Sequence, residues 1–131
     1  MPRVTTLTPE GTVTPIGPYN HIAIVGDNIT IGGVAGFDPE TGKLAGPDVG
    51  TQTRQILKSF AGMLEHAGSD LDHVVHVSIF LKDMSDFEEM NAVYSDVFGD
   101  HLPARTAFAV AELPKPGLRL TMNLTAVKRD M

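Results

Sequence analysis

The strongest constraint on the fold of this sequence is a helical repeat of apolar residues between Asp48 and Gly68. Apolar side chains recur there at intervals of three or four positions, and polar side chains mostly occupy the opposite face. The apolar face comprises Val49, Ile56, Leu57, Phe60, Met63, Leu64 and Ala67, and the polar face comprises Gln52, Arg54, Gln55, Lys58 and Glu65. Asp48 suits an N-cap and Gly68 a C-terminal stop. The pattern predicts a long amphipathic helix that buries one face against another layer.

A second helix is predicted between Ser85 and Gly99. Ser85 and Glu88 form a capping-box pattern in which Ser85 is the N-cap. The buried stripe of this helix comprises Phe87, Met90, Tyr94, Val97 and Phe98. Asn91 lies beside the stripe between two apolar neighbours, so it is less easily assigned to the surface than an ordinary polar residue.

Six stretches have the composition or the alternation of strands. They are Arg3–Leu7, His21–Val25, Ile29–Val34, Val74–Leu81, Thr106–Ala111 and Leu118–Val127. Val74–Leu81 has apolar residues on both faces, as expected of a central strand that is covered on both sides. In the last stretch, apolar residues alternate with polar ones that include Thr121 and Asn123. The order of elements predicts an α+β fold, with residues 1–131 forming one domain in which two helices cover one face of a mixed sheet of about six strands.

Charge and composition limit the partners that this chain can bind. The net charge of −6 and the pI of about 5.2 argue against a nucleic-acid partner, which needs a basic face. The sequence has no cysteine, which excludes disulfides and thiolate ligands and fits a reducing compartment. It has neither an apolar run of membrane-spanning length nor a signal-peptide pattern, so we expect a cytoplasmic protein without a membrane partner.

Two local patterns suggest sites but have simpler explanations. His73 and His76 have the spacing of some metal ligands, yet at the start of a strand this spacing places them on opposite faces, so no metal site is expected. The run from Gly32 to Gly36 lacks the fingerprint of a dinucleotide site. Tight packing is the favoured explanation for its glycines, and close approach of the backbone to a ligand is the alternative.

Arg105 follows a proline, between the second predicted helix and the next strand. Its planar guanidinium can bind a small carboxylate with two parallel hydrogen bonds. It can equally form a structural ion pair with one of the 16 acidic residues. The residue type serves both uses, so the sequence leaves the two alternatives open.

Five motifs occur in an order that resembles the RidA/YjgF family, also known as the endoribonuclease L-PSP family. They are Ile16-Gly17-Pro18-Tyr19, Phe37-Asp38-Pro39-Glu40-Thr41-Gly42, Gln52-Thr53-Arg54-Gln55, Asn91-Ala92-Val93-Tyr94 and Pro103-Ala104-Arg105, within a collinear match over residues 15–127. The resemblance implies a chorismate-mutase-like subunit in a homotrimer, with ligand clefts between subunits. It also implies hydrolysis of reactive enamines and imines such as 2-aminoacrylate to a ketoacid and ammonia, a form of metabolite damage control that uses no metal or organic cofactor.

The resemblance assigns roles to particular residues of this sequence. Arg105 would bind the substrate carboxylate, Tyr19 would line the cleft, Asn91 would help to shape it, and Gly33 would bring the backbone close to the ligand. Other positions depart from the family pattern. Gly32 replaces a serine, Ala107 replaces a cysteine, Asn20-His21 replaces Ser-Gln, and Thr121 stands where the family usually has a glutamate that activates water.

These departures leave two functional hypotheses. The first is a diverged deaminase that acts on an aminoacrylate-like or aminomuconate-like carboxylate. A threonine hydroxyl is not a base at neutral pH, so the substrate amine, His21 or Glu112 would have to activate the water. The second hypothesis is a non-catalytic module that binds or senses a small carboxylate.

Overall fold

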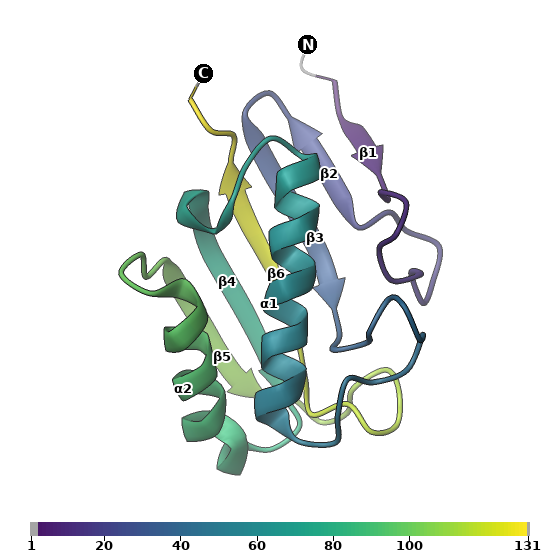
Figure 1. Cartoon of the computed structure of the whole chain (residues 1–131), viewed down its shortest axis with the longest axis vertical. Helices are drawn as coiled ribbons and strands as arrows, with labels where there is room; N and C mark the ends of the chain where they lie inside the picture. The colour runs from purple at the N-terminus through teal and green to yellow at the C-terminus, as the bar shows by residue number, and fades with distance from the viewer. Residues whose placement is uncertain (1–2, 131) are drawn as a thin grey trace.

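The computed structural model describes residues 3–130 and has one six-stranded sheet (Figure 1). Met1, Pro2 and Met131, which the predicted domain also includes, lie outside the described residues. The strands are β1 (Thr5–Leu7), β2 (Ile22–Val25), β3 (Asn28–Val34), β4 (Val74–Leu81), β5 (Ala104–Ala109) and β6 (Leu120–Val127), in the spatial order β1-β2-β3-β6-β4-β5. β4 and β5 are parallel and the other neighbours are antiparallel. The mixed sheet is therefore confirmed.

Two helices, α1 (Val49–His66) and α2 (Phe87–Phe98), cover the same face of this sheet (Figure 1). Two single-turn 3₁₀ helices, η1 (Leu71–His73) and η2 (Met84–Asp86), precede β4 and α2. The long α1 results from the apolar repeat, and its start is fixed by Asp48, whose carboxylate accepts a hydrogen bond from the Thr51 amide at 2.9 Å. Gly68 has a φ of 82°, which suits the stop that ends α1. The predicted α+β fold with both helices on one face is confirmed.

The start of α2 differs from the predicted capping box. Asp83 accepts a hydrogen bond from the Ser85 amide and begins η2, and α2 follows after Asp86, which makes no side-chain capping bond. The prediction of Ser85 as the N-cap is therefore wrong. An Asp two residues earlier competes successfully for the same backbone donors and inserts a 3₁₀ turn.

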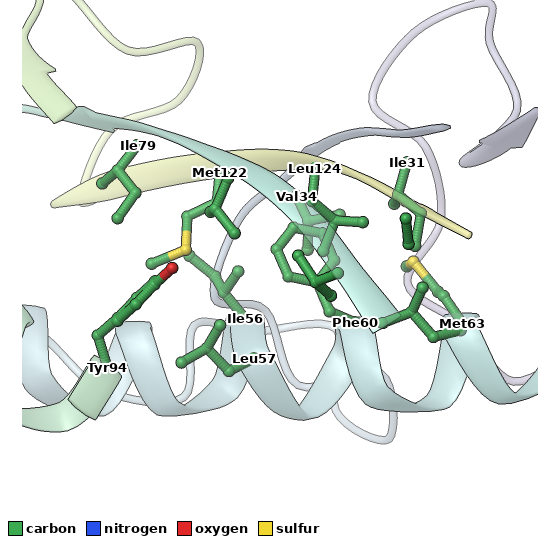
Figure 2. Close-up of a cluster of buried hydrophobic side chains, with 14 of the residues drawn as sticks. Ile31, Val34, Ile56, Leu57, Phe60, Met63, Ile79, Tyr94, Met122 and Leu124 are labelled. Carbon is green, nitrogen blue, oxygen red and sulfur yellow. The ribbon is translucent and has the colours of Figure 1, made fainter. Parts of the chain in front are cut away.

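The hydrophobic core lies between the helices and the sheet. Figure 2 shows Ile56, Leu57, Phe60 and Met63 of α1 pointing toward the sheet, where they meet the buried side chains of Ile31, Val34, Met122 and Leu124. The alternation predicted for the last strand is confirmed, because Leu118, Leu120, Met122, Leu124 and Ala126 are all buried. The polar residues between them lie on the opposite, open face of the sheet. No helix in the described residues is long and apolar enough to cross a membrane.

A β-bulge changes which residues of β4 are buried. The pairing of β4 with β6 shifts between Val74 and His76, so Val75 falls out of register and is 51% exposed. Val74 lies on the helix face instead, in line with Val77 and the other buried residues of the strand. Within this chain the second face of β4 is only half-buried, so the expectation that both faces are covered is not met by one subunit.

Gln52 is buried, although the helical pattern places it on the polar face of α1. Its amide nitrogen donates to the carbonyls of Gly46 and Gly117 at 2.9 and 3.1 Å, and its amide oxygen accepts from the Arg119 amide at 2.8 Å. Every polar atom of the side chain therefore has a partner, which makes its burial tolerable. The side chain ties α1 to the two loops that precede α1 and β6.

Candidate functional site

A cleft of about 360 Å³ lies beside the C-terminal end of β3. It is lined by Val13, Thr14, Ile16, Tyr19, Asn20, His21, Gly32, Gly33, Val34, Ala35, Phe37, Pro114 and Thr121. Four of the predicted site residues, Tyr19, Gly32, Gly33 and Thr121, are thus brought together from the loop before β2 and from strands β3 and β6. Its volume falls in the range of small-molecule sites in proteins.

Tyr19 and His21 form one wall of this cleft. Their rings meet edge to face with centroids 5.8 Å apart, and Tyr19 is 41% exposed whereas His21 is 2% exposed. Nε2 of His21 lies 2.6 Å from the carbonyl oxygen of Val13, so Nε2 carries the proton of the neutral ring. Nδ1 is then left with a lone pair; it is buried and has no hydrogen-bond partner among the described residues. His21 is the one unpartnered basic group among the side chains that line the cleft.

Gly32 and Gly33 form an open part of the cleft floor. The pairing of β3 with β6 shifts between Ile31 and Val34, which places both glycines in a bulge. A Cβ atom added at Gly32 would meet only the His21 carbonyl, at 4.0 Å, and one added at Gly33 would meet nothing within 4 Å. A Cβ atom at Gly36 would lie 2.9 Å from Gln52. Tight packing therefore explains Gly36, and it does not explain Gly32 or Gly33.

Arg105 lies outside this cleft, on the edge strand β5, and its side chain packs against α2. Its guanidinium carbon is 4.9 Å from the ring centroid of Tyr94 and 5.6 Å from that of Phe87, and Nη1 donates to Sδ of Met90 at 4.0 Å. Aromatic faces attract the cation and hold its plane in place. In residues 3–130, no carboxylate oxygen lies within 4.0 Å of this guanidinium. The ion-pair alternative for Arg105 is therefore not realised within the described part of the chain.

The groups around Arg105 keep its surroundings free of negative charge. Burial raises the pKa of the Tyr94 phenol to about 12, and the positive charge of Arg105 opposes part of this rise. The phenol is therefore neutral at physiological pH. Tyr94 belongs to the buried stripe of α2, as predicted, and its ring points toward Met122 in Figure 2. Asn91 is half-buried one turn away, and its Oδ1 has no partner among the described residues.

The predicted site residues thus fall into two groups on opposite faces of the sheet. Arg105 pairs in register with Val77, which is fully buried under the helices, and Ala107 packs against the same core. Thr121 pairs with Phe80, whose neighbours along β4 are buried, so Thr121 faces the open side. β4 also lies between β5 and β6. Within one subunit, the guanidinium of Arg105 and the cleft at Thr121 cannot contact the same small molecule.

Other candidates from the sequence stay outside the cleft. Nδ1 of His73 hydrogen-bonds Asp70 at 2.6 Å. Nε2 of His76 instead lies 3.1 Å from the hydroxyl of Thr106 on β5, so the two histidines do not share a partner. Glu112 is exposed and does not line the cleft. In the part of the chain that the structure describes, no group of three or more acidic, histidine or cysteine side chains is placed to hold a metal ion.

Several cleft residues were not expected from the sequence. Val13, Phe37 and Pro114 come from three separate loops, and their side chains meet only because the loops converge beside β3. Proline and glycine in such loops favour turns but do not give the direction of the chain, so the sequence alone does not bring these side chains together.

The fold and the cleft together define a chorismate-mutase-like α+β protein with a cleft of small-molecule size on the open face of its sheet. The chain belongs to the RidA/YjgF family, because the model of the family described as Endoribonuclease L-PSP matches residues 10–128. It is 45% identical to a RutC family protein of Pyrococcus abyssi over 114 residues, which cover 87% of this chain and 89% of the relative.

Two further relatives connect the family to a structure and to an activity. The crystal structure of the YjgF gene product of E. coli superposes with a TM-score of 0.88 at 34% identity, covering 95% of this chain and 99% of that one. The chain is also 37% identical to the 2-iminobutanoate/2-iminopropanoate deaminase of Homo sapiens over 113 residues, covering 86% of this chain and 82% of the human protein. Imine deamination is therefore an activity found within the family.

Proposed function

We propose that this protein hydrolyses small 2-imino carboxylates, or the enamines in equilibrium with them, to 2-keto acids and ammonia. The observation that carries the proposal is the guanidinium of Arg105, which aromatic rings hold in place and which has no carboxylate partner among residues 3–130. A half-buried cation in this state favours an anionic ligand, because electrostatic attraction is stronger away from bulk water. The human deaminase among its relatives supports the reaction class.

The chemistry requires only water. The carboxylate of the substrate binds the guanidinium fork, and a water molecule attacks the carbon of the C=N bond. A C–O bond forms, the π electrons of the C=N bond pass to nitrogen, and nitrogen takes up the proton that the attacking water loses. In the resulting carbinolamine the hydroxyl proton passes to nitrogen, the C–N bond breaks to release ammonia, and a C=O bond remains. Because this reaction is intrinsically easy, positioning of the substrate supplies much of the rate.

We propose further that the site is shared between subunits of a homotrimer. The cleft of one subunit faces open solvent, and Arg105 lies at the edge strand on the other side of the sheet. A head-to-tail arrangement of identical subunits brings two such different surfaces together at every interface, and it closes into a ring. The face of β4 that points away from the helices is only half-buried in one subunit, and this supports the same assembly. The proposed setting is cytoplasmic control of reactive metabolites.

His21 is the group that we propose for activation of water. Thr121 has no basic group and Glu112 does not line the cleft, whereas the His21 ring lines the cleft and its buried Nδ1 has no partner among the described residues. Two variants separate a basic role from a structural one. His21→Gln can keep the bond to the Val13 carbonyl but has no basic nitrogen, whereas His21→Asn loses that bond.

We expect His21→Gln to lower kcat by about 100-fold with little change in KM, the usual scale of general base catalysis. Urea unfolding should show that His21→Gln keeps most of the wild-type stability and that His21→Asn is the less stable of the two, since only the latter loses the buried hydrogen bond. A His21→Gln enzyme with wild-type kcat would refute the basic role and would leave the substrate amine as the alternative.

The reaction itself can be measured with 2-aminoacrylate generated from serine by a dehydratase. We expect the protein to accelerate the appearance of pyruvate and ammonia beyond the rate in protein-free buffer, without added metal or cofactor. Titration calorimetry with pyruvate or 2-ketobutyrate gives the second readout. Binding without any acceleration would favour the sensing module, and the absence of both would reject a role for this chain in imine chemistry.

A further inference from the structure

We propose that the cleft selects 2-imino acids with a bulky apolar side chain, of the branched aliphatic or aromatic kind, over the smallest members of the class. This inference rests on the proposed function and adds a substrate preference to it. Three features of the cleft carry the inference, namely the absence of charged lining, the open floor at two glycines, and its volume.

The lining of the cleft is suited to a neutral, apolar group. It has no Asp, Glu, Lys or Arg, and its polar side chains are limited to Thr14, Asn20, His21 and Thr121, apart from the Tyr19 hydroxyl. The Tyr19 hydroxyl itself accepts a hydrogen bond from the Ile16 amide at 3.3 Å. The remaining side chains are aliphatic, aromatic or proline. A carboxylate placed here would lose hydration without gaining a cation, so the charged end of the substrate must point toward Arg105 of a neighbouring subunit.

Two glycines keep the floor of the cleft open, although glycine lowers the stability of strand β3. Glycine weakens a strand interior, so two successive glycines in β3 need a reason. Neither Gly32 nor Gly33 has the positive φ that would require glycine. A Cβ atom at either position would find space, with the nearest described atom 4.0 Å away at Gly32 and none within 4 Å at Gly33. The open space therefore is not needed for the fold of this subunit, and a ligand side chain can use it.

The volume of the cleft exceeds what the smallest substrate can fill. 2-Aminoacrylate has only one carbon beyond its α-carbon, so it would contact only a small part of the 360 Å³ cleft that one subunit contributes. Dispersion contacts and removal of apolar surface from water favour a ligand that fills an apolar cavity. A leucine-derived or phenylalanine-derived imine places its side chain against Phe37 and Val13 while its reacting carbon stays near His21 and Thr121.

The preference can be measured with imines that an L-amino-acid oxidase generates in situ from leucine, phenylalanine or alanine. Semicarbazide traps the remaining imine, so enzymatic hydrolysis appears as a loss of semicarbazone absorbance. We expect kcat/KM for the leucine and phenylalanine imines to exceed that for the alanine imine by about 10-fold or more, the usual effect of added methylenes in an apolar pocket.

Variants at Gly32 assign this preference to the cleft. Gly32→Val fills part of the floor, so it should reduce the ratio of bulky to small substrate by about 10-fold. Gly32→Ala should cause a smaller reduction in the same direction, and it tests the floor even where valine disturbs the strand. Gly62→Ala is the matched control, because Gly62 lies on α1 outside the cleft and a Cβ atom there also meets nothing within 4 Å. We expect this control to keep the wild-type ratio.

The outcomes distinguish this inference from the function on which it rests. No acceleration for any of the three imines would reject the deaminase function itself. Acceleration with equal kcat/KM for all three, or with a preference for the alanine imine, would overturn the substrate preference and leave the function standing. A preference for bulky imines that Gly32→Val and Gly32→Ala leave unchanged would show that these glycines do not provide the selective space, and it would overturn the assignment.

Discussion

Replacement of Arg105 by alanine is expected to lower kcat/KM for imine hydrolysis by about 100-fold or more. The physical reason is the loss of the only proposed cation for the substrate carboxylate, which would otherwise enter a partly dry site without a counter-charge. The guanidinium would also fix the direction of a bound substrate, because Tyr94 and Phe87 hold its plane. The measurement is steady-state hydrolysis of an oxidase-generated imine by the purified variant.

Two controls separate binding at Arg105 from its contribution to folding. Arg105→Lys keeps the charge but not the planar fork, so its activity should lie between those of the alanine variant and the wild type. The free energy of unfolding of Arg105→Ala should fall by only about 1 to 2 kcal/mol, since two partly exposed cation–π contacts are lost. An alanine variant that folds normally and retains wild-type kcat/KM would show that Arg105 does not bind substrate.

Most of the secondary structure follows from local patterns in the sequence. The apolar repeat of α1 and the alternation of β6 are strong because each burial pattern extends over many residues. The details that differ depend on contacts between distant segments. Gln52 is polar and was placed on the solvent face, yet it is buried because carbonyls of Gly46 and Gly117 meet its amide there. Val75 is exposed because of a bulge that arises from pairing with β6.

Part of the cleft lining, namely Tyr19, Gly32, Gly33 and Thr121, could be named from the sequence, but the arrangement of the cleft could not. The alternation of β6 was enough to place Thr121 on the polar face of its strand. The orientation of Arg105 depends on the pairing of β5 with β4, which the sequence does not specify. The open floor at Gly32 and Gly33 could not be predicted either, since it depends on how distant segments pack and leave this space unfilled by any described residue. The placement of Arg105 and Thr121 on opposite faces of the sheet is therefore a structural result.

The second large effect that we expect is the recovery of imine hydrolysis when two inactive variants are assembled into mixed oligomers. Gly33→Trp fills the cleft and leaves Arg105 intact, whereas Arg105→Ala leaves the cleft intact, so each variant alone should be nearly inactive. If every site combines the cleft of one subunit with Arg105 of the next, a mixed oligomer contains some sites in which both halves are intact. Random assembly of equal amounts should restore about one quarter of the wild-type activity.

This complementation is the measurement that tests the shared site most directly. The two variants are unfolded in urea, mixed and refolded together, and the rate of imine hydrolysis is compared with that of each variant refolded alone. Size-exclusion chromatography with light scattering confirms that each sample is folded and assembled as a trimer. The shared site predicts activity in the mixture that neither parent has. A folded, assembled mixture that is as inactive as its parents would contradict it.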